Sequence, residues 1–143
     1  MSQKAVIIGA GHAGGILAAQ LARAGEAFDI TLVGEETWPP YERPPLSKQL
    51  LAGEIPVEKT FLRPADFYEK KGIDLKLGVR CDVIDRKCRK VMLSDGSALD
   101  YDLLALCTGA RLRRIDIPGS ALSGVHYIRA IADTDAIRAE ARE

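Results

Sequence analysis

A glycine-rich turn near the start of the chain limits most strongly what the sequence can fold into. Residues 5–8 form a continuous apolar run, as expected of a strand covered on both faces of its sheet. The turn Gly9-x-Gly11-x-x-Gly14 follows at once, and residues 16–24 have the apolar spacing of a helix. Because a second apolar strand begins at Phe28, the segment predicts a strand, a helix and a parallel strand in succession.

Each glycine of this turn has a separate physical role in a dinucleotide site. The first makes the tight turn, the second lets the backbone approach a pyrophosphate, and the third lets helix and strand pack closely. The free N–H groups and the positive dipole end of the following helix favour an anion. His12 lies inside this loop, where its imidazole could face a phosphate or solvent, and we place it with the cofactor-binding positions rather than as a catalyst.

Glu35 supports the same interpretation. It stands 21 residues after Gly14, at the end of the second strand, where a carboxylate can accept hydrogen bonds from ribose hydroxyls. A carboxylate there repels a 2′-phosphate, so we do not expect NADP at this site.

Composition excludes several other classes of function. The 143 residues suit one domain, and 20 Lys and Arg balance 20 Asp and Glu, which argues against a nucleic-acid or acidic-membrane partner. The sequence has no apolar run long enough for a membrane span and no secretory signal, so we expect a cytoplasmic protein.

The cysteines indicate that redox chemistry would require a bound cofactor. Cys81, Cys88 and Cys107 form no C-x-x-C pair, and the chain has only two histidines, so we expect neither a dithiol nor a metal site. We expect three reduced and mostly buried thiols.

The chain as a whole is predicted to have an α/β fold with a central parallel sheet and a small antiparallel β-meander. We expect helices over 46–51 and 64–71, and a last helix from residue 132 with Asp133 as its N-cap. Further strands are expected at 73–77, 81–85, 90–93, 98–101, 103–107 and 125–129.

Residues 41–50 read Tyr-Glu-Arg-Pro-Pro-Leu-Ser-Lys-Gln-Leu. Two cations flank a pair of prolines here, which a simple spacer would not require. The prolines are never three apart, which argues against a proline-rich ligand. Arg43 can bind a pyrophosphate oxygen. Lys48 is expected in the first turn of a helix, an unfavourable place for a cation unless an electron-rich group such as a flavin lies beside it.

Taken together, the glycine turn, Glu35, the run Arg43-Pro-Pro-Leu-Ser-Lys48 and Thr108-Gly109-Ala110 resemble the FAD-dependent ferredoxin reductases of bacterial P450 and ring-hydroxylating dioxygenase systems. The resemblance implies a Rossmann-like FAD-binding domain. Its implied function is transfer of electrons from NADH through FAD to a [2Fe–2S] ferredoxin.

The resemblance also implies a role for each matching residue. Lys48 would lie nearest the flavin ring, as the one catalytic residue, and Arg43 would also contact the cofactor. Cys81 stands where the family usually has a valine whose backbone pairs with adenine. The other implied FAD contacts are Gly9, Gly11, Ala13 and Gly14 by backbone to the pyrophosphate, Glu35 to the ribose, and Thr108, Gly109 and Arg129.

The resemblance leaves alternatives open because members of this family are much longer. We expect residues 1–143 to be the N-terminal part of the FAD-binding domain, without the NADH-binding and C-terminal domains. The chain could therefore be a fragment that binds without turnover. Another flavin-dependent NAD(P)H oxidoreductase is a further alternative, although a coenzyme A-disulfide or peroxide-reducing relative would need a cysteine within 34–53, and none is present.

Overall fold

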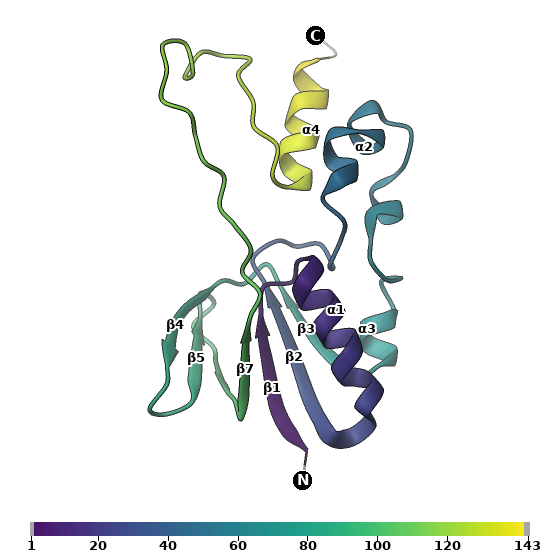
Figure 1. The fold of residues 1–143 in the computed structure, drawn as a ribbon, viewed down its shortest axis with the longest axis vertical. Coiled ribbons are helices and arrows are strands. Elements are labelled where there is room, and N and C mark those ends of the chain that lie inside the picture. Colours follow the sequence, from purple (N-terminus) through teal and green to yellow (C-terminus); the bar gives the residue numbers. More distant parts are fainter. Residues whose placement is uncertain (1, 142–143) are drawn as a thin grey trace. The chain divides into compact units, whose positions relative to one another are not determined.

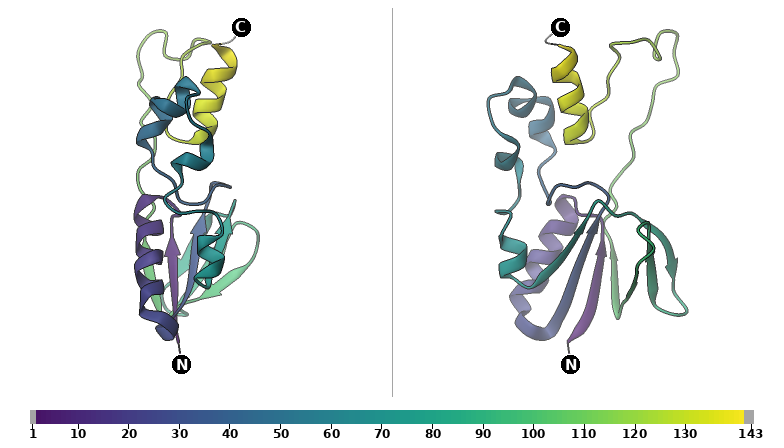
Figure 2. Two further views of the ribbon diagram at one scale, coloured as in Figure 1. Left: turned by 90° about the vertical axis from the view of Figure 1, so that its right-hand side faces the viewer. Right: turned by 180° about the vertical axis from the view of Figure 1, so that it is seen from behind.

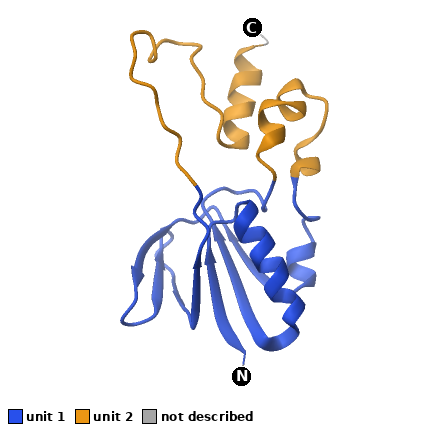
Figure 3. Ribbon diagram, in the orientation of Figure 1, with its two compact units in different colours: residues 1–41, 61–109 blue, residues 42–60, 110–143 orange. Residues whose placement is uncertain are grey.

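A computed structural model describes residues 2–141 of the chain. These residues divide into two compact units, each formed by two stretches of sequence (Figure 3). We call residues 1–41 and 61–109 the sheet unit, and residues 42–60 and 110–143 the helical unit.

A four-stranded parallel sheet forms the centre of the sheet unit (Figure 1). Its strand order is β3-β2-β1-β7, and β1 pairs with β2 from Gln3 opposite Phe28 onward. Helix α1 and a 3₁₀ turn, η1, connect β1 to β2, which confirms the predicted strand–helix–strand unit. The elements are β1 (Gln3–Ile8), α1 (His12–Leu21), η1 (Ala22–Ala27), β2 (Phe28–Gly34), β3 (Ile73–Leu77) and β7 (Leu103–Leu106).

The two faces of this sheet bury different partners. Ile7 and Leu32 pack on one face with Ala18 of α1 and Tyr68 of the short helix α3 (Phe67–Lys70). Their sequence neighbours point to the other face, where the core includes Val6, Ile8 and Val33 of the sheet and Val91 and Leu93 of the meander. Figure 2 shows α1 and the meander on opposite sides of the sheet. Burial on both faces explains why these strands are continuously apolar.

The predicted antiparallel meander is present, in the order β4-β5-β6. Its strands are β4 (Cys81–Asp85), β5 (Lys90–Leu93) and β6 (Ala98–Asp100). The parallel sheet ends at β7, whose Leu103 and Leu106 are 44% and 63% exposed. One edge of the sheet is thus an apolar strand with a neighbour on one side only, within the described residues.

The helical unit consists of short helical turns and one longer helix. They are η2 (Pro44–Ser47), α2 (Gln49–Ala52), η3 (Val57–Thr60) and α4 (Ile131–Glu140). The fully buried Thr134 of α4 donates a hydrogen bond of 3.0 Å from Oγ1 to the Leu46 carbonyl. This bond joins the two sequence stretches of the unit.

Four predictions about local structure are wrong. Residues 125–129 have no pairing strand and include a bend at Arg129, so they form no β-strand. Helix α3 begins at Phe67 and not at residue 64. Asp133 is not the N-cap of α4: it lies at the third helical position, where its carboxylate accepts hydrogen bonds from the backbone N–H groups of Arg129 and Ala130. Cys88 is exposed in the β4–β5 turn, and the other two cysteines are only half-buried.

No helix among residues 2–141 is both long enough and apolar enough to cross a bilayer.

Two buried tyrosines of the sheet unit give a matched stability test. Tyr68 is 1% exposed and its hydroxyl has no hydrogen-bond partner in the described structure, whereas Tyr41, 2% exposed, donates to Glu36 Oε2 at 2.5 Å. An unsatisfied buried hydroxyl is unfavourable, so Tyr68→Phe should raise the free energy of unfolding by about 1 kcal/mol and Tyr41→Phe should lower it by about 1 kcal/mol. Urea denaturation measures both, and destabilisation by Tyr68→Phe would contradict the structure.

The same hydroxyl predicts a pH effect. Burial, opposed by the nearby charge of Arg63, raises the pKa of Tyr68 from 10.0 to about 12. Between these two values the unfolded chain loses a proton that the folded chain keeps, so wild-type stability should fall as pH rises through this window. Tyr68→Phe should lack this part of the alkaline loss in a urea series across that range.

Candidate functional site

Three of the predicted site segments begin where parallel strands end. Gly9 follows β1, Glu35 follows β2 and Thr108 lies just beyond β7. The carboxyl ends of parallel strands meet at one edge of a sheet, which is where ligands bind in open α/β folds. Two backbone hydrogen bonds fix this edge: Gly9 N–H donates to the Val33 carbonyl at 2.8 Å, and Cys107 N–H donates to the Ile8 carbonyl at 2.7 Å.

Two glycines of the turn are required by close backbone packing. Gly9 has a φ of +110°, and a Cβ there would lie 2.2 Å from the Cys107 carbonyl oxygen. A Cβ on Gly14 would lie 1.9 Å from the Gly9 carbonyl oxygen. No side chain larger than hydrogen fits at either position, so the sequence here fixes how α1 leaves β1.

Gly11 has a different environment. A Cβ placed on it would meet no atom of the described structure within 4 Å. It is the N-cap of α1, yet no side chain caps this helix end. His12 and Ala13 follow on the exposed surface, where the first N–H groups of the helix lack intrahelical acceptors. Open space beside free N–H groups and a helix dipole suits an anionic phosphate, so these residues fit a dinucleotide.

Glu35 lies next to a cation that the sequence did not reveal. Its carboxylate is 71% exposed, and Oε1 lies 3.7 Å from Nη1 of Arg80. Arg80 stands in the turn between β3 and β4, directly before Cys81. No motif marks this arginine, because its position depends on how that turn folds back beside β2.

Cys81 is half-buried at the start of β4. Burial, with a smaller contribution from the charge of Asp82, raises the pKa of its thiol. Burial alone raises the pKa of the Cys107 thiol, and for Cys88 a hydrogen bond to Asp85 is the main cause of a raised pKa. These shifts disfavour the thiolate, so none of the three has the electrostatic environment of a reactive cysteine.

The helical unit brings Arg43 and Arg129 together. Nη1 of Arg43 donates a hydrogen bond to the backbone carbonyl of Arg129. Nε of Arg129 donates to the Ala110 carbonyl at 2.9 Å. Asp133 holds the backbone of this segment by accepting from Arg129 N–H at 2.8 Å. The two predicted arginines are therefore neighbours in one hydrogen-bonded cluster, and Asp133 is a supporting residue that the sequence suggested only as a helix cap.

Arg43 and Arg129 are partly buried and donate hydrogen bonds to backbone carbonyls. Lys48, in contrast, is exposed and has no ion-pair partner within residues 2–141. It lies at the N-cap of α2 rather than inside its first turn, with its backbone N–H bonded to the Pro45 carbonyl at 3.0 Å. A cation at the amino end of a helix is disfavoured by the dipole, and the described structure provides no local compensation.

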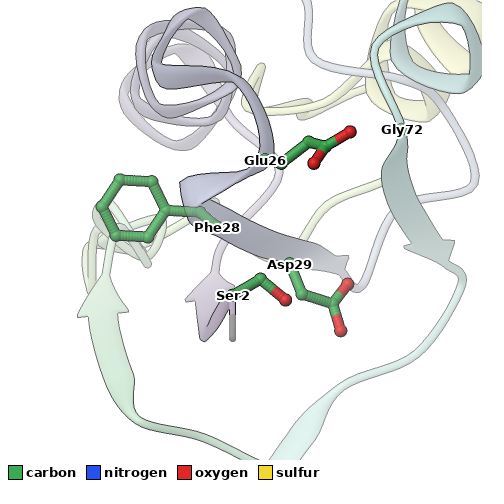
Figure 4. A pocket seen from close by; sticks show the side chains of 5 residues that line it. All are labelled: Ser2, Glu26, Phe28, Asp29 and Gly72. Carbon is green, nitrogen blue, oxygen red and sulfur yellow. The ribbon is translucent and has the colours of Figure 1, made fainter.

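Other features of the described structure offer no competing site. A shallow depression at the start of β2 is lined by Ser2, Glu26, Phe28, Asp29 and Gly72 (Figure 4). It lies at the amino end of the strand, away from the glycine turn, and its two carboxylates would repel a phosphate. No three His, Cys, Asp or Glu side chains among the described residues are placed to hold a metal ion.

A family comparison and a search for similar proteins point to the same group of oxidoreductases. Residues 3–143 match the family described as pyridine nucleotide-disulphide oxidoreductase. The chain is 44% identical over 138 residues to a probable ferredoxin reductase of Castellaniella defragrans. The aligned segment covers 96% of this chain and 34% of that protein. The chain thus spans about a third of the length of the relatives it matches.

Solved structures agree with the sequence relatives. A ferredoxin reductase for the CYP199A2 system from Rhodopseudomonas palustris superposes with a TM-score of 0.89 at 37% identity, covering 97% of this chain and 34% of that one. A chain of the covalent putidaredoxin reductase–putidaredoxin complex gives a TM-score of 0.82 at 38% identity, with coverages of 96% and 34%.

The glycine turn predicts contrasting effects of two small substitutions. Gly14→Ala forces a methyl group onto the Gly9 carbonyl and should lower the free energy of unfolding by about 2–3 kcal/mol. Gly11→Ala adds the same methyl group in open space at a φ of −90°, at an N-cap where Ala is less favourable than Gly, and should lower this free energy by no more than about 1 kcal/mol. Urea denaturation of both variants measures the difference. Equal losses would show that the turn is not packed as described.

Proposed function

Since the chain belongs to the pyridine nucleotide-disulphide oxidoreductase family, we propose that it forms an FAD-binding part of an NADH:ferredoxin oxidoreductase. The observation that carries the proposal is the open space at Gly11 beside the uncapped amino end of α1. Such a cradle suits a pyrophosphate, and Glu35 follows the next strand to receive a ribose. We propose residues 1–143 as the N-terminal part of the FAD-binding domain.

The sheet unit would bind the adenosine and pyrophosphate groups. Backbone N–H groups of the glycine turn, including those of His12 and Ala13, would donate to phosphate oxygens. The Glu35 carboxylate would accept from the ribose hydroxyls, and the Cys81 backbone would pair with adenine. Thr108 and Gly109, both exposed after β7, would lie against the cofactor.

Three basic residues would provide the cations. Arg129 uses Nε for the Ala110 carbonyl, which leaves its terminal nitrogens for a phosphate oxygen, and Arg43 would contact the cofactor from the same cluster. Lys48 would place an ammonium group near the flavin ring, where it favours the negative charge of the reduced form. Bound FAD would supply hydride acceptance from NADH and one-electron transfer to a [2Fe–2S] ferredoxin.

The proposed partners follow from the relatives. Two of the similar proteins are named ferredoxin reductases, and a third, a putidaredoxin reductase, is seen in a covalent complex with putidaredoxin. The absence of cysteine in residues 34–53 argues against a thiol-dependent member of the same family. We propose a cytoplasmic location because the substrate nucleotide, NADH, is an intracellular reductant.

Titration of the chain with FAD tests the proposal directly. Saturable binding, followed by flavin fluorescence, is the expected result. A chain that folds by circular dichroism but shows no saturable FAD binding would contradict the proposed cofactor site.

Glu35→Gln should weaken FAD binding by about tenfold or more, because hydrogen bonds to a charged group contribute about 1.5–3 kcal/mol. The Kd from the same titration measures the effect. Glu26→Gln is the matched control, since Glu26 is an exposed carboxylate at the opposite end of β2 and should leave the Kd unchanged. A Glu35→Gln variant with wild-type affinity would remove Glu35 from the ribose site.

Lys48→Ala should move the reduction potential of bound FAD to a more negative value, because the variant loses a charge that favours the reduced anion. A reductive titration against a dye of known potential measures the shift. Lys59→Ala, which removes another exposed lysine of the helical unit, should leave the potential unchanged. Equal potentials for wild type and Lys48→Ala would separate Lys48 from the flavin.

A further inference from the structure

An arginine outside every motif lies beside the carboxylate proposed to bind ribose. Arg80 and Glu35 come from different turns, and the backbone fixes their proximity. Gly78 N–H donates to the Glu36 carbonyl at 3.0 Å, and Val79 N–H donates to the Gly34 carbonyl at 3.0 Å. These two bonds tie the β3–β4 turn to the residues on either side of Glu35.

The guanidinium of Arg80 is itself held in place. Its Nε donates to Oδ1 of Asp82 at 2.8 Å, and its backbone N–H donates to Oγ of Ser94 at 2.9 Å. Asp82 first, and Glu35 to a lesser extent, raise the pKa of this arginine. With Nε committed to Asp82, the terminal nitrogen Nη1 faces Glu35 at 3.7 Å.

The arrangement leaves half of the Glu35 carboxylate available. Arg80 approaches Oε1, so Oε2 and its lone pairs remain for hydroxyl donors. An exposed glutamate otherwise has several rotamers, and ordering its side chain on ligand binding is unfavourable. A neighbouring fixed cation reduces that loss before the ligand arrives.

From this geometry we propose that Arg80 is a positioning residue for the adenosine ribose: it acts on the nucleotide through Glu35 and not by direct contact. The proposal rests on the proposed function, because it assumes that Glu35 binds the ribose of FAD. Both side chains are more than half exposed, at 58% for Arg80 and 71% for Glu35, so the effect on affinity is small.

FAD titration of the chain at low ionic strength, with Kd as the readout, tests the proposal. Arg80→Gln should weaken FAD binding by about two- to fivefold, the range for an exposed ion pair. Arg80→Lys keeps the charge and should recover part of this loss. Arg86→Gln, which removes an exposed arginine from the nearby β4–β5 turn, should leave the Kd unchanged.

A double-mutant cycle separates positioning from direct contact. In a Glu35→Gln background, Arg80→Gln should have no further effect on the Kd. Asp82→Ala, which removes the acceptor of Nε and so frees the guanidinium without removing it, should weaken binding in the same direction as Arg80→Gln. It provides a second test if Arg80→Gln fails to fold by circular dichroism.

Several results would overturn the proposal. One is an unchanged or tighter Kd for Arg80→Gln, or for Asp82→Ala if that variant is used in its place. Another is an Arg80→Gln loss that persists in full in the Glu35→Gln background, which would mean that Arg80 contacts FAD itself. If the wild-type chain binds no FAD, the proposed function fails and this proposal fails with it. If the wild-type chain binds FAD and Arg80→Gln binds it with the same Kd, only the positioning role is overturned.

Discussion

The structure depends on the approach of two backbone segments at the start of α1. Gly14 packs so closely on the Gly9 carbonyl, and Gly9 on the Cys107 carbonyl, that neither position has room for a Cβ. This contact sets the direction of α1 across the sheet and links the ends of β1 and β7. The open face at Gly11 follows from it, because the helix can present its first N–H groups only if the turn before it is this tight.

Because the central strands are parallel, the polar segments that follow them lie at one edge of the sheet, the edge formed by the carboxyl ends of the strands. All four central strands are parallel, so the glycine turn, Glu35 and Thr108 emerge together without any sequence proximity. The depression at the amino end of β2 is polar as well, but it has carboxylates and no helix N-terminus. The region at the amino end of β2 therefore repels an anion, whereas the carboxyl edge of the sheet attracts one, so only the carboxyl edge suits a phosphate.

Much of this was predictable because local patterns and global packing agree. Strands 73–77, 81–85 and 90–93 have the predicted bounds, since each is an alternating or apolar run between turn residues. Residues 125–129 have the same composition but no partner strand, which no local pattern can reveal. Arg80 was missed for a related reason: its position beside Glu35 comes from two backbone hydrogen bonds between distant turns. The sequence places Asp133 at the correct helix end, but its carboxylate accepts hydrogen bonds from the third helical position and not from the N-cap.

The edge strand β7 has a consequence for how the sheet could be extended. Residues 103–106, Leu-Leu-Ala-Leu, contain no charge and no proline, the usual devices by which proteins discourage pairing at a sheet edge. Main-chain groups on the outer side of this strand form a template on which another extended segment can add without breaking a hydrogen bond. Within residues 2–141, β7 is therefore the strand at which a further segment could extend the sheet.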